Sequence, residues 1–78
     1  MSIGIKKAFG QVTRRLRKAL KMSQRELARK SEIHVNTIQL VELGLVEIKL
    51  TTLFFIAKGL GVPLDEFMRA FIDHYYSK

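Results

Sequence analysis

Apolar residues near the start of the chain recur at intervals of three or four positions. The stripe consists of Ile5, Phe9, Val12, Leu16 and Leu20. This spacing places the side chains on one face of an α-helix. Gly10 interrupts the helix and costs about 1 kcal/mol relative to Ala in a helix interior. The pattern predicts a first helix over roughly residues 3–21.

A second, short helix is expected next. Ser23 precedes "QRE", and a Ser followed three residues later by a Glu, here Glu26, forms a capping box that starts a helix. Leu27 and Ala28 then face inward, and the helix is expected to end near Ser31.

A third helix is expected within "EIHVNTIQLVELG". It starts near Val35, and Gly44 is well placed to stop it, because glycine readily adopts the left-handed conformation at a helix end. His34 falls at the N-cap, where Ser or Thr is more usual. The inward face consists of Ile33, Ile38 and Val41.

Two further helices complete the pattern. "LTTLFFIAKGLG" predicts a fourth helix that ends at Gly61, and Pro63 opens a fifth that continues through "LDEFMRAFIDHYY". The inward residues of the fourth helix are expected to be Leu50, Leu53, Ile56, Ala57 and Leu60. No segment alternates between apolar and polar residues with a period of two, so the sequence predicts an all-α fold of five helices.

The size and composition of the chain narrow its class. Seventy-eight residues allow a single domain over residues 1–78, with a core modest enough that a partner subunit is a reasonable expectation. The sequence has no Cys, and therefore no disulfide or thiolate metal site. No signal peptide and no membrane-spanning stretch is recognisable. We expect a soluble, cytoplasmic protein.

The net charge of +7 is unevenly distributed. Residues 1–30 hold ten Lys and Arg against Glu26, a net of +9, whereas residues 31–78 carry a net of −2. A cationic half is typical of proteins that bind nucleic acid or an anionic membrane surface. Composition alone leaves open a third reading, a solubilising surface without a partner.

A short capped helix, a tight turn and a second short helix form a helix-turn-helix. The stretch from Ser23 to Gly44 resembles the Cro/C1-type (Xre-family) DNA-binding domain. The matching residues are Ser23, Gln24, Leu27 and Ala28 for "SQ-x-x-LA", and Ile56 to Phe67 for "IAxxLGVxLDEL". The resemblance covers roughly residues 12–68. It implies a compact lambda-repressor-like fold and sequence-specific binding of double-stranded DNA, usually as a homodimer on a two-fold operator.

The resemblance also implies which residues read the bases. The third helix would lie in the major groove with its N-terminal residues at base edges. The positions carried over are Val35, Asn36, Thr37, Gln39 and Leu40. Asn and Gln can bond adenine in bidentate pairs, and Val or Leu can meet a thymine methyl, so this set favours A·T-containing steps. The spacing of Asn36 and Gln39 alone favours an exposed polar face without contacts, and it is the motif around them that favours base reading.

The expected phosphate contacts depart from the family pattern. Gln24 matches a position that holds DNA phosphate and braces the reading helix. The family commonly places basic residues beyond the "IE-x-G" Glu, but this chain has Leu43, Leu45, Val46 and Glu47 there. We therefore expect the first two helices to supply the cations. The candidates are Arg14, Arg15, Lys18, Lys21, Arg25 and Arg29.

The apolar exit of the third helix needs an explanation of its own. Leu43, Leu45, Val46 and Ile48 cannot all enter the core. We expect Ile48 to cover the groove between the first and fourth helices. The others could form a subunit contact, since a contiguous exposed apolar patch needs a reason.

Glu42 is the charged residue of the third helix. An acid near the end of a reading helix opposes both the helix dipole and DNA. The resemblance places at Arg17 an Arg that pairs with this Glu, so we predict a largely buried, bidentate Arg17–Glu42 ion pair. The alternative is two exposed charges that never meet.

The last helix, about residues 63–76, is apolar over a wide arc. Leu64, Phe67 and Phe71 form one stripe, and Met68, Ile72 and Tyr75 or Tyr76 form a neighbouring one. One stripe can close the core, and the other would remain in water without a partner. We predict a two-fold homodimer that uses this helix, with the 43–46 loop as a possible addition. The predicted interface residues are Met68, Phe71, Ile72 and Tyr75.

Other function classes fit less well. We expect no enzyme activity, no metal and no cofactor, because the chain lacks a metal-ligand cluster and a Gly-rich phosphate loop, and His34 and His74 have no partner at recognisable spacing. A small-molecule ligand is not expected, since 78 residues leave no room for a sensing domain. Membrane binding is not expected either, because the apolar stripe of the first helix matches core positions.

The alternative to a DNA-binding regulator is a helix-turn-helix module that binds protein. A phage-type repressor, an antitoxin, a plasmid regulator and a restriction–modification controller all remain open.

Overall fold

The structure, a computed structural model, describes residues 4–77, and over that range it contains five α-helices and no strand. In chain order they are α1 (Ile5–Ala19), α2 (Gln24–Ser31), α3 (Val35–Leu43), α4 (Leu50–Leu60) and α5 (Leu64–Tyr76). The predicted all-α, five-helix fold is confirmed. The predicted start of the first helix at residue 3 lies outside the described residues. Pro63 is the N-cap of α5 rather than its first residue.

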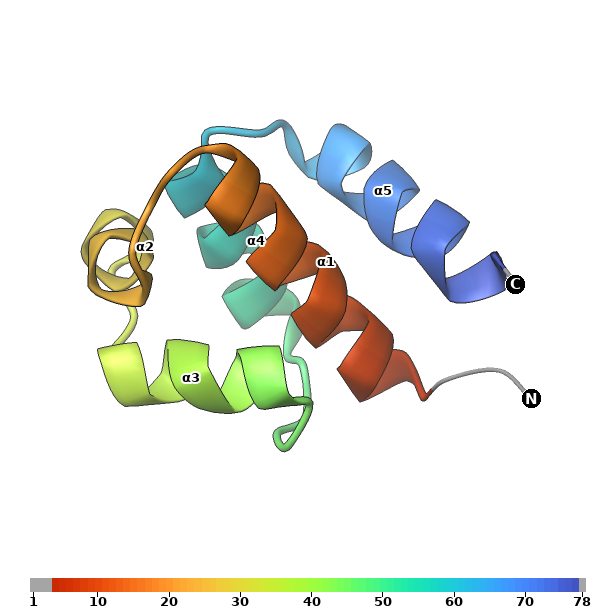
Figure 1. Ribbon diagram of the computed structural model, residues 1–78, viewed down its shortest axis with the longest axis horizontal. Helices are drawn as coiled ribbons and strands as arrows, with labels where there is room; N and C mark the ends of the chain where they lie inside the picture. The colour runs from red at the N-terminus through yellow and green to blue at the C-terminus, as the bar shows by residue number, and fades with distance from the viewer. Residues whose placement is uncertain (1–3, 78) are drawn as a thin grey trace.

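Figure 1 shows how the helices are arranged around α1. α1 runs diagonally across the molecule, with α3 below it, α4 behind it and α5 on the far side from α2. α2 packs against α3 and α4, while α1 packs against α3 and α5. α3 therefore lies at one edge of the fold, where one of its sides faces away from the other helices.

All five helices contribute to one apolar core. Its largest fully buried side chains are Phe9 and Val12 from α1, Leu27 from α2, Ile38 and Val41 from α3, Ile56 from α4 and Phe67 from α5. The rings of Phe9 and Phe67 meet edge to face, with centroids 5.4 Å apart. Full burial of a large apolar side chain is worth roughly 1.5–3 kcal/mol, so this core is the main source of stability.

Three residues that were predicted to face inward are exposed. Ile5 is 58% exposed, Leu20 48% and Leu50 78%. Ile5 and Leu50 are the first residues of their helices, and Leu20 is the C-cap residue of α1. The spacing rule is correct for the middle of each helix but wrong at these positions, because the neighbouring helices do not extend over the ends.

Gly10 is explained by the way α1 meets α3. A Cβ atom at this position would collide with the carbonyl oxygen of Val41 and would lie 2.9 Å from that of Glu42. Real Cβ atoms do not come so close to backbone atoms, so only glycine allows this approach. Gly44, the C-cap of α3, has a left-handed φ of 73° and lies against the backbone of Lys7. The two glycines fix the end of α3 directly on α1.

Candidate nucleic-acid interface

The helix-turn-helix is built from two capped helices. The Ser23 Oγ accepts a hydrogen bond from the Glu26 N–H at 3.0 Å and so begins α2. The His34 Nδ1 accepts from the Asn36 N–H at 3.1 Å and begins α3, as its predicted N-cap position implies. Each contact satisfies one of the free N–H groups at a helix start. The local sequence therefore determines where α3 begins, and with it which side chains point outward.

The outer face of α3 carries no charge. Asn36, Gln39, Leu40 and Leu43 are all exposed, whereas Ile38 and Val41 are buried in the core. Of the other base-reading candidates, Val35 is half-buried and packs against the core, and Thr37 is half-buried. The exposed surface of α3 thus offers two amides and two leucines.

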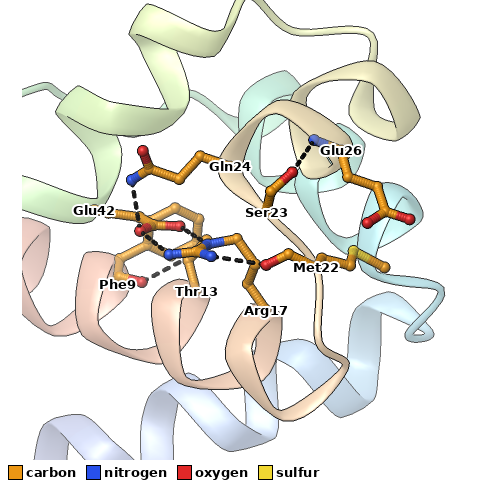
Figure 2. Close-up of polar contacts among 8 residues, drawn as sticks. All are labelled: Phe9, Thr13, Arg17, Met22, Ser23, Gln24, Glu26 and Glu42. Atoms are coloured by element: carbon orange, nitrogen blue, oxygen red, sulfur yellow. Dashed lines mark hydrogen bonds and ion pairs between the residues drawn. The ribbon is translucent and has the colours of Figure 1, made fainter.

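The structure brings together Arg17 of α1 and Glu42 of α3, the two residues for which the sequence predicted an ion pair. Arg17 donates from Nε to Glu42 Oε2 at 2.7 Å and from Nη2 to Glu42 Oε1 at 3.0 Å. Figure 2 shows the planar guanidinium facing the carboxylate. The side chains are only 9% and 4% exposed. The contact is a bidentate, charge-assisted pair that turns the acid of α3 away from its outer face.

Two further hydrogen bonds extend this pair into a network, and one of them comes from Gln24, which was expected to brace α3. Arg17 Nη1 donates to the Met22 carbonyl at 2.8 Å, in the turn between α1 and α2. The Gln24 Nε2 donates to Glu42 Oε1 at 3.0 Å (Figure 2). Gln24 is the first residue of α2, where the Ser23 cap fixes its position. We call Arg17, Gln24 and Glu42 the polar network; it ties α1, α2 and α3 to one another.

A shallow hollow lies between these three helices. Its volume is about 310 Å³, and its lining consists of Arg14, Gln24, Gln39, Glu42 and Leu43. Of the candidates for phosphate contact, the structure therefore places Arg14 and Gln24 beside the amide of Gln39. Arg15, Lys18 and Arg25 are exposed on α1 and α2 but do not line this hollow.

The exit from α3 divides into a buried and an exposed part. Val46 and Ile48 are partly buried and pack against the core, so Ile48 does not contribute to an exposed patch. Leu43 is 63% and Leu45 65% exposed. Glu47 forms an open surface pair with Lys6, whose Nζ lies 3.4 Å from the carboxylate.

The four residues predicted for the dimer interface are not equivalent. Phe71 is half-buried and meets Phe9 edge to face at 5.9 Å, so it belongs mainly to the core. Tyr75 stacks on Phe71 at 6.2 Å, Met68 is half-buried, and Ile72 is 44% exposed.

A second apolar surface lies at the junction of α4 and α5, where the sequence predicted no site. An open hollow of about 350 Å³ is lined by Leu50, Thr51, Phe54, Phe55 and Leu64. Phe54 is 51% exposed. A helical wheel of the α4 sequence could have identified Phe54 as an outward-facing aromatic residue, but Leu50 was assigned to the core.

Metal-binding and membrane-spanning features are absent from residues 4–77. No cluster of three or more His, Cys, Asp or Glu side chains that could hold a metal ion occurs there. No helix in the same range is long and apolar enough to cross a membrane.

The fold is similar to that of several solved structures, among them two restriction-modification controller proteins. C.AhdI, a restriction-modification controller protein from Aeromonas hydrophila, shares 31% identity at a TM-score of 0.75, covering 80% of this chain and 94% of that one. Wild-type controller protein C.Esp1396I shares 25% identity at a TM-score of 0.86, covering 92% and 94%. The C.Esp1396I tetramer in complex with its natural 35 base-pair operator reaches a TM-score of 0.90 at 24% identity, covering 96% and 99%. Among curated proteins, none matches the chain significantly.

The fold and the arrangement of α2 and α3 define a helix-turn-helix protein of the DNA-binding, transcription-regulating class. A family model described as Helix-turn-helix matches residues 14–67, from the middle of α1 to the first turn of α5. The chain belongs to this Cro/C1-type helix-turn-helix family.

Proposed function

We propose that this chain binds double-stranded DNA sequence-specifically and regulates transcription as a homodimer on a two-fold operator, with α3 in the major groove. The family match and the likeness to solved controller proteins support a DNA-binding regulator. The observation that carries the proposal is the placement of α3. Its inner side is fixed by the polar network, and its outer side exposes Asn36 and Gln39 at an open edge of the fold.

The exposed amides are suited to reading base edges. Asn and Gln side chains can bond adenine N6 and N7 together. Asn36 lies in the first turn of α3, and N-terminal residues of a reading helix are those that reach the bases. Gln39 lies one turn further, with Leu40 beside it. Val35 and Thr37 flank this set at half-buried positions.

Cations on α1 and α2 would hold the phosphates on either side of the bases. Arg14 lies closest to the reading face, because it lines the same hollow as Gln24 and Gln39. Lys18 follows Arg14 by one helical turn, and Arg15 and Arg25 are exposed on the same two helices. Phosphate contacts position a protein and base contacts specify the sequence, so this division of labour compensates for the missing cations of α3.

A homodimer would cover the apolar surface of α5. Ile72 is 44% and Tyr76 74% exposed, and Met68 and Tyr75 are half-buried on the same helix. The exposed residues Leu50 and Phe54 of α4 add apolar area beside the start of α5, because they line one hollow with Leu64. A two-fold pair of such chains would present two α3 helices about one DNA turn apart.

Among regulators, we favour a restriction–modification controller. C.AhdI is 31% identical over 94% of its length, so the likeness extends to nearly the whole of that controller. C.Esp1396I, a second controller, was solved on its natural operator as a tetramer, which supports assembly on DNA for chains of this size.

Selection from random duplexes, followed by a salt titration of the selected sequence, tests the proposal. We expect one enriched two-fold sequence, and log K should fall with log salt by about 0.9 for each phosphate neutralised. Absence of any enriched sequence, or binding that is indifferent to salt, would reject it.

One observation favours a second candidate, a helix-turn-helix that binds protein. Leu43 and Leu45 are 63% and 65% exposed, and α3 contains no Lys or Arg. The same salt titration separates the two, because a module that binds only protein shows no counterion-release slope with DNA.

A further inference from the structure

This inference rests on the proposed function and concerns the leucines of the reading helix. Asn36, Leu40 and Leu43 are spaced four and three residues apart, so they line one face of α3, and all three are exposed. Leu40 is 40% and Leu43 63% exposed. Glu42, the charged residue of α3, is withdrawn into the polar network and 4% exposed. The outer face of α3 therefore carries the amide of Asn36 and, next along the helix, an apolar strip formed by Leu40 and Leu43.

An apolar strip cannot bind phosphate, so its partner on DNA must be an apolar group. In the major groove, the apolar group that base edges present is the C5-methyl of a pyrimidine, as in thymine. The strip is continuous with the amide of Asn36, which is suited to adenine. An adenine step also brings a thymine methyl into the same stretch of groove.

We propose that Leu40, extended by Leu43, is a contact site for pyrimidine C5-methyl groups, so that this chain distinguishes methylated from unmethylated pyrimidines within its half-site. Leu40 carries the larger part, because residues nearer the N-terminus of a reading helix reach deeper into the groove and Leu43 is the last residue of α3. The methyl group could belong to thymine or to 5-methylcytosine, which present it at the same place on the base edge.

Single-base replacement in the selected duplex tests this site. Each thymine of one half-site is exchanged in turn for deoxyuridine, which removes the methyl and leaves the hydrogen-bonding groups unchanged. At the contacted position the wild-type protein should bind about fourfold more weakly, the value expected for one buried carbon group. In Leu40→Ala this discrimination should disappear, and in Leu43→Ala it should shrink. Leu20→Ala, an exposed leucine at the C-cap of α1, should keep it in full.

A second arm separates the two sources of the methyl group. Cytosine is placed at the contacted position, with and without its 5-methyl group. A gain on methylation shows that the methyl is read in either base. A gain confined to thymine over deoxyuridine assigns the site to thymine.

The outcome that overturns the inference is equal binding of thymine and deoxyuridine duplexes at every position, or discrimination that survives in both Leu40→Ala and Leu43→Ala. Either result leaves the proposed function standing, since sequence-specific binding is still observed. Loss of the proposed function would appear earlier, as a failure to select any duplex.

Discussion

The two halves of the molecule differ in where their polar and apolar side chains are placed. Where α1, α2 and α3 meet, polar groups join the helices: Arg17, Gln24 and Glu42 are hydrogen-bonded to one another, and the pair at its centre is nearly inaccessible to water. The α4–α5 half has no comparable buried ion pair among residues 4–77. Both halves expose aliphatic side chains, but within the described range of the chain the exposed large aromatic ones lie in the α4–α5 half: Phe54 is 51% and Tyr76 74% exposed.

This contrast indicates which half is complete. The polar network satisfies its charges internally, so the orientation of α3 needs no other molecule. The apolar side chains of α4 and α5 are stabilised only when something covers them. We infer that the first half reads a ligand and that the second half holds a partner.

Glu42→Ala has the largest expected effect, because it leaves the guanidinium of Arg17 buried without a counter-charge. Removal of one partner of a buried pair typically costs about 3–5 kcal/mol, a large share of the stability of a small protein. Thermal melts should show an unfolded or strongly loosened variant. Glu47→Ala is the control, since its carboxylate is open to solvent beside Lys6. Equal melting temperatures for the two variants would show that the network does not hold the fold together.

The second prediction concerns the α4–α5 half. Ile72→Asp should convert a dimer into a monomer, because symmetry removes two large apolar side chains worth roughly 1.5–3 kcal/mol each. Sedimentation at micromolar concentration measures the change. Leu20→Asp, at the similar exposure of 48%, should stay dimeric. A wild-type chain that is monomeric both alone and on DNA would contradict the inference that the α4–α5 half holds a partner subunit.

The third prediction tests the packing of α1 against α3. Helix propensity alone would make Gly10→Ala stabilising by about 1 kcal/mol. We expect the opposite sign, because the new Cβ would collide with the Val41 carbonyl oxygen, and overpacking typically costs about 1–3 kcal/mol. Denaturant unfolding gives the sign directly. Gly4→Ala, which meets nothing within 4 Å, serves as the comparison.

The fourth prediction concerns base choice. Asn36→Ala with Gln39→Ala should relax the preference for the selected sequence by about 1–3 kcal/mol for each bidentate pair that is removed, while stability is retained. Competition with duplexes altered at single positions measures this. Gln11→Ala removes an amide that bonds His74 instead, and should leave the preference unchanged. Full preference in the double variant would mean that another face of the protein reads the bases.

The smallest expected effects are those of single cations. Arg14→Ala and Arg15→Ala should weaken binding to all sequences alike and reduce the salt slope by about 0.9 for each phosphate that is no longer neutralised. Arg14 should matter more, because it lies beside Gln24 and Gln39. Arg69→Ala on α5 provides the control. An unchanged salt slope in both variants would indicate that the phosphate contacts lie elsewhere on the basic half.

The helix boundaries were predictable because each depends on one or two neighbouring residues. Ser23 and His34 cap α2 and α3 through their own side chains, and Gly44 and Gly61 end α3 and α4 with left-handed φ values of 73° and 71°. The Arg17–Glu42 pairing was accessible only through the family resemblance, because the two residues are 25 positions apart.

What the sequence did not predict depends on which helix lies across from which. The spacing of Leu50 is that of a core residue, and its exposure follows from the absence of a helix over the start of α4. Gln24 was expected to hold a phosphate and to brace α3, but that it braces α3 through the Glu42 carboxylate depends on the start of α2 lying within reach of the end of α3. Gly10 looked like a defect of α1 until the carbonyl of Val41 was located beside it.

In the proposed complex with DNA, the backbone approach at Gly10 would also restrict the spacing of the operator. Because no side chain separates α1 from the end of α3 there, a change of rotamer at this contact cannot alter the distance between the two helix backbones. In the proposed complex, this fixed backbone distance would set the interval between the phosphate contacts of α1 and the base contacts of α3. One base pair inserted within a half-site would prevent the phosphate and base contacts from forming together. A base pair inserted between half-sites would instead have to be accommodated where the two protomers meet.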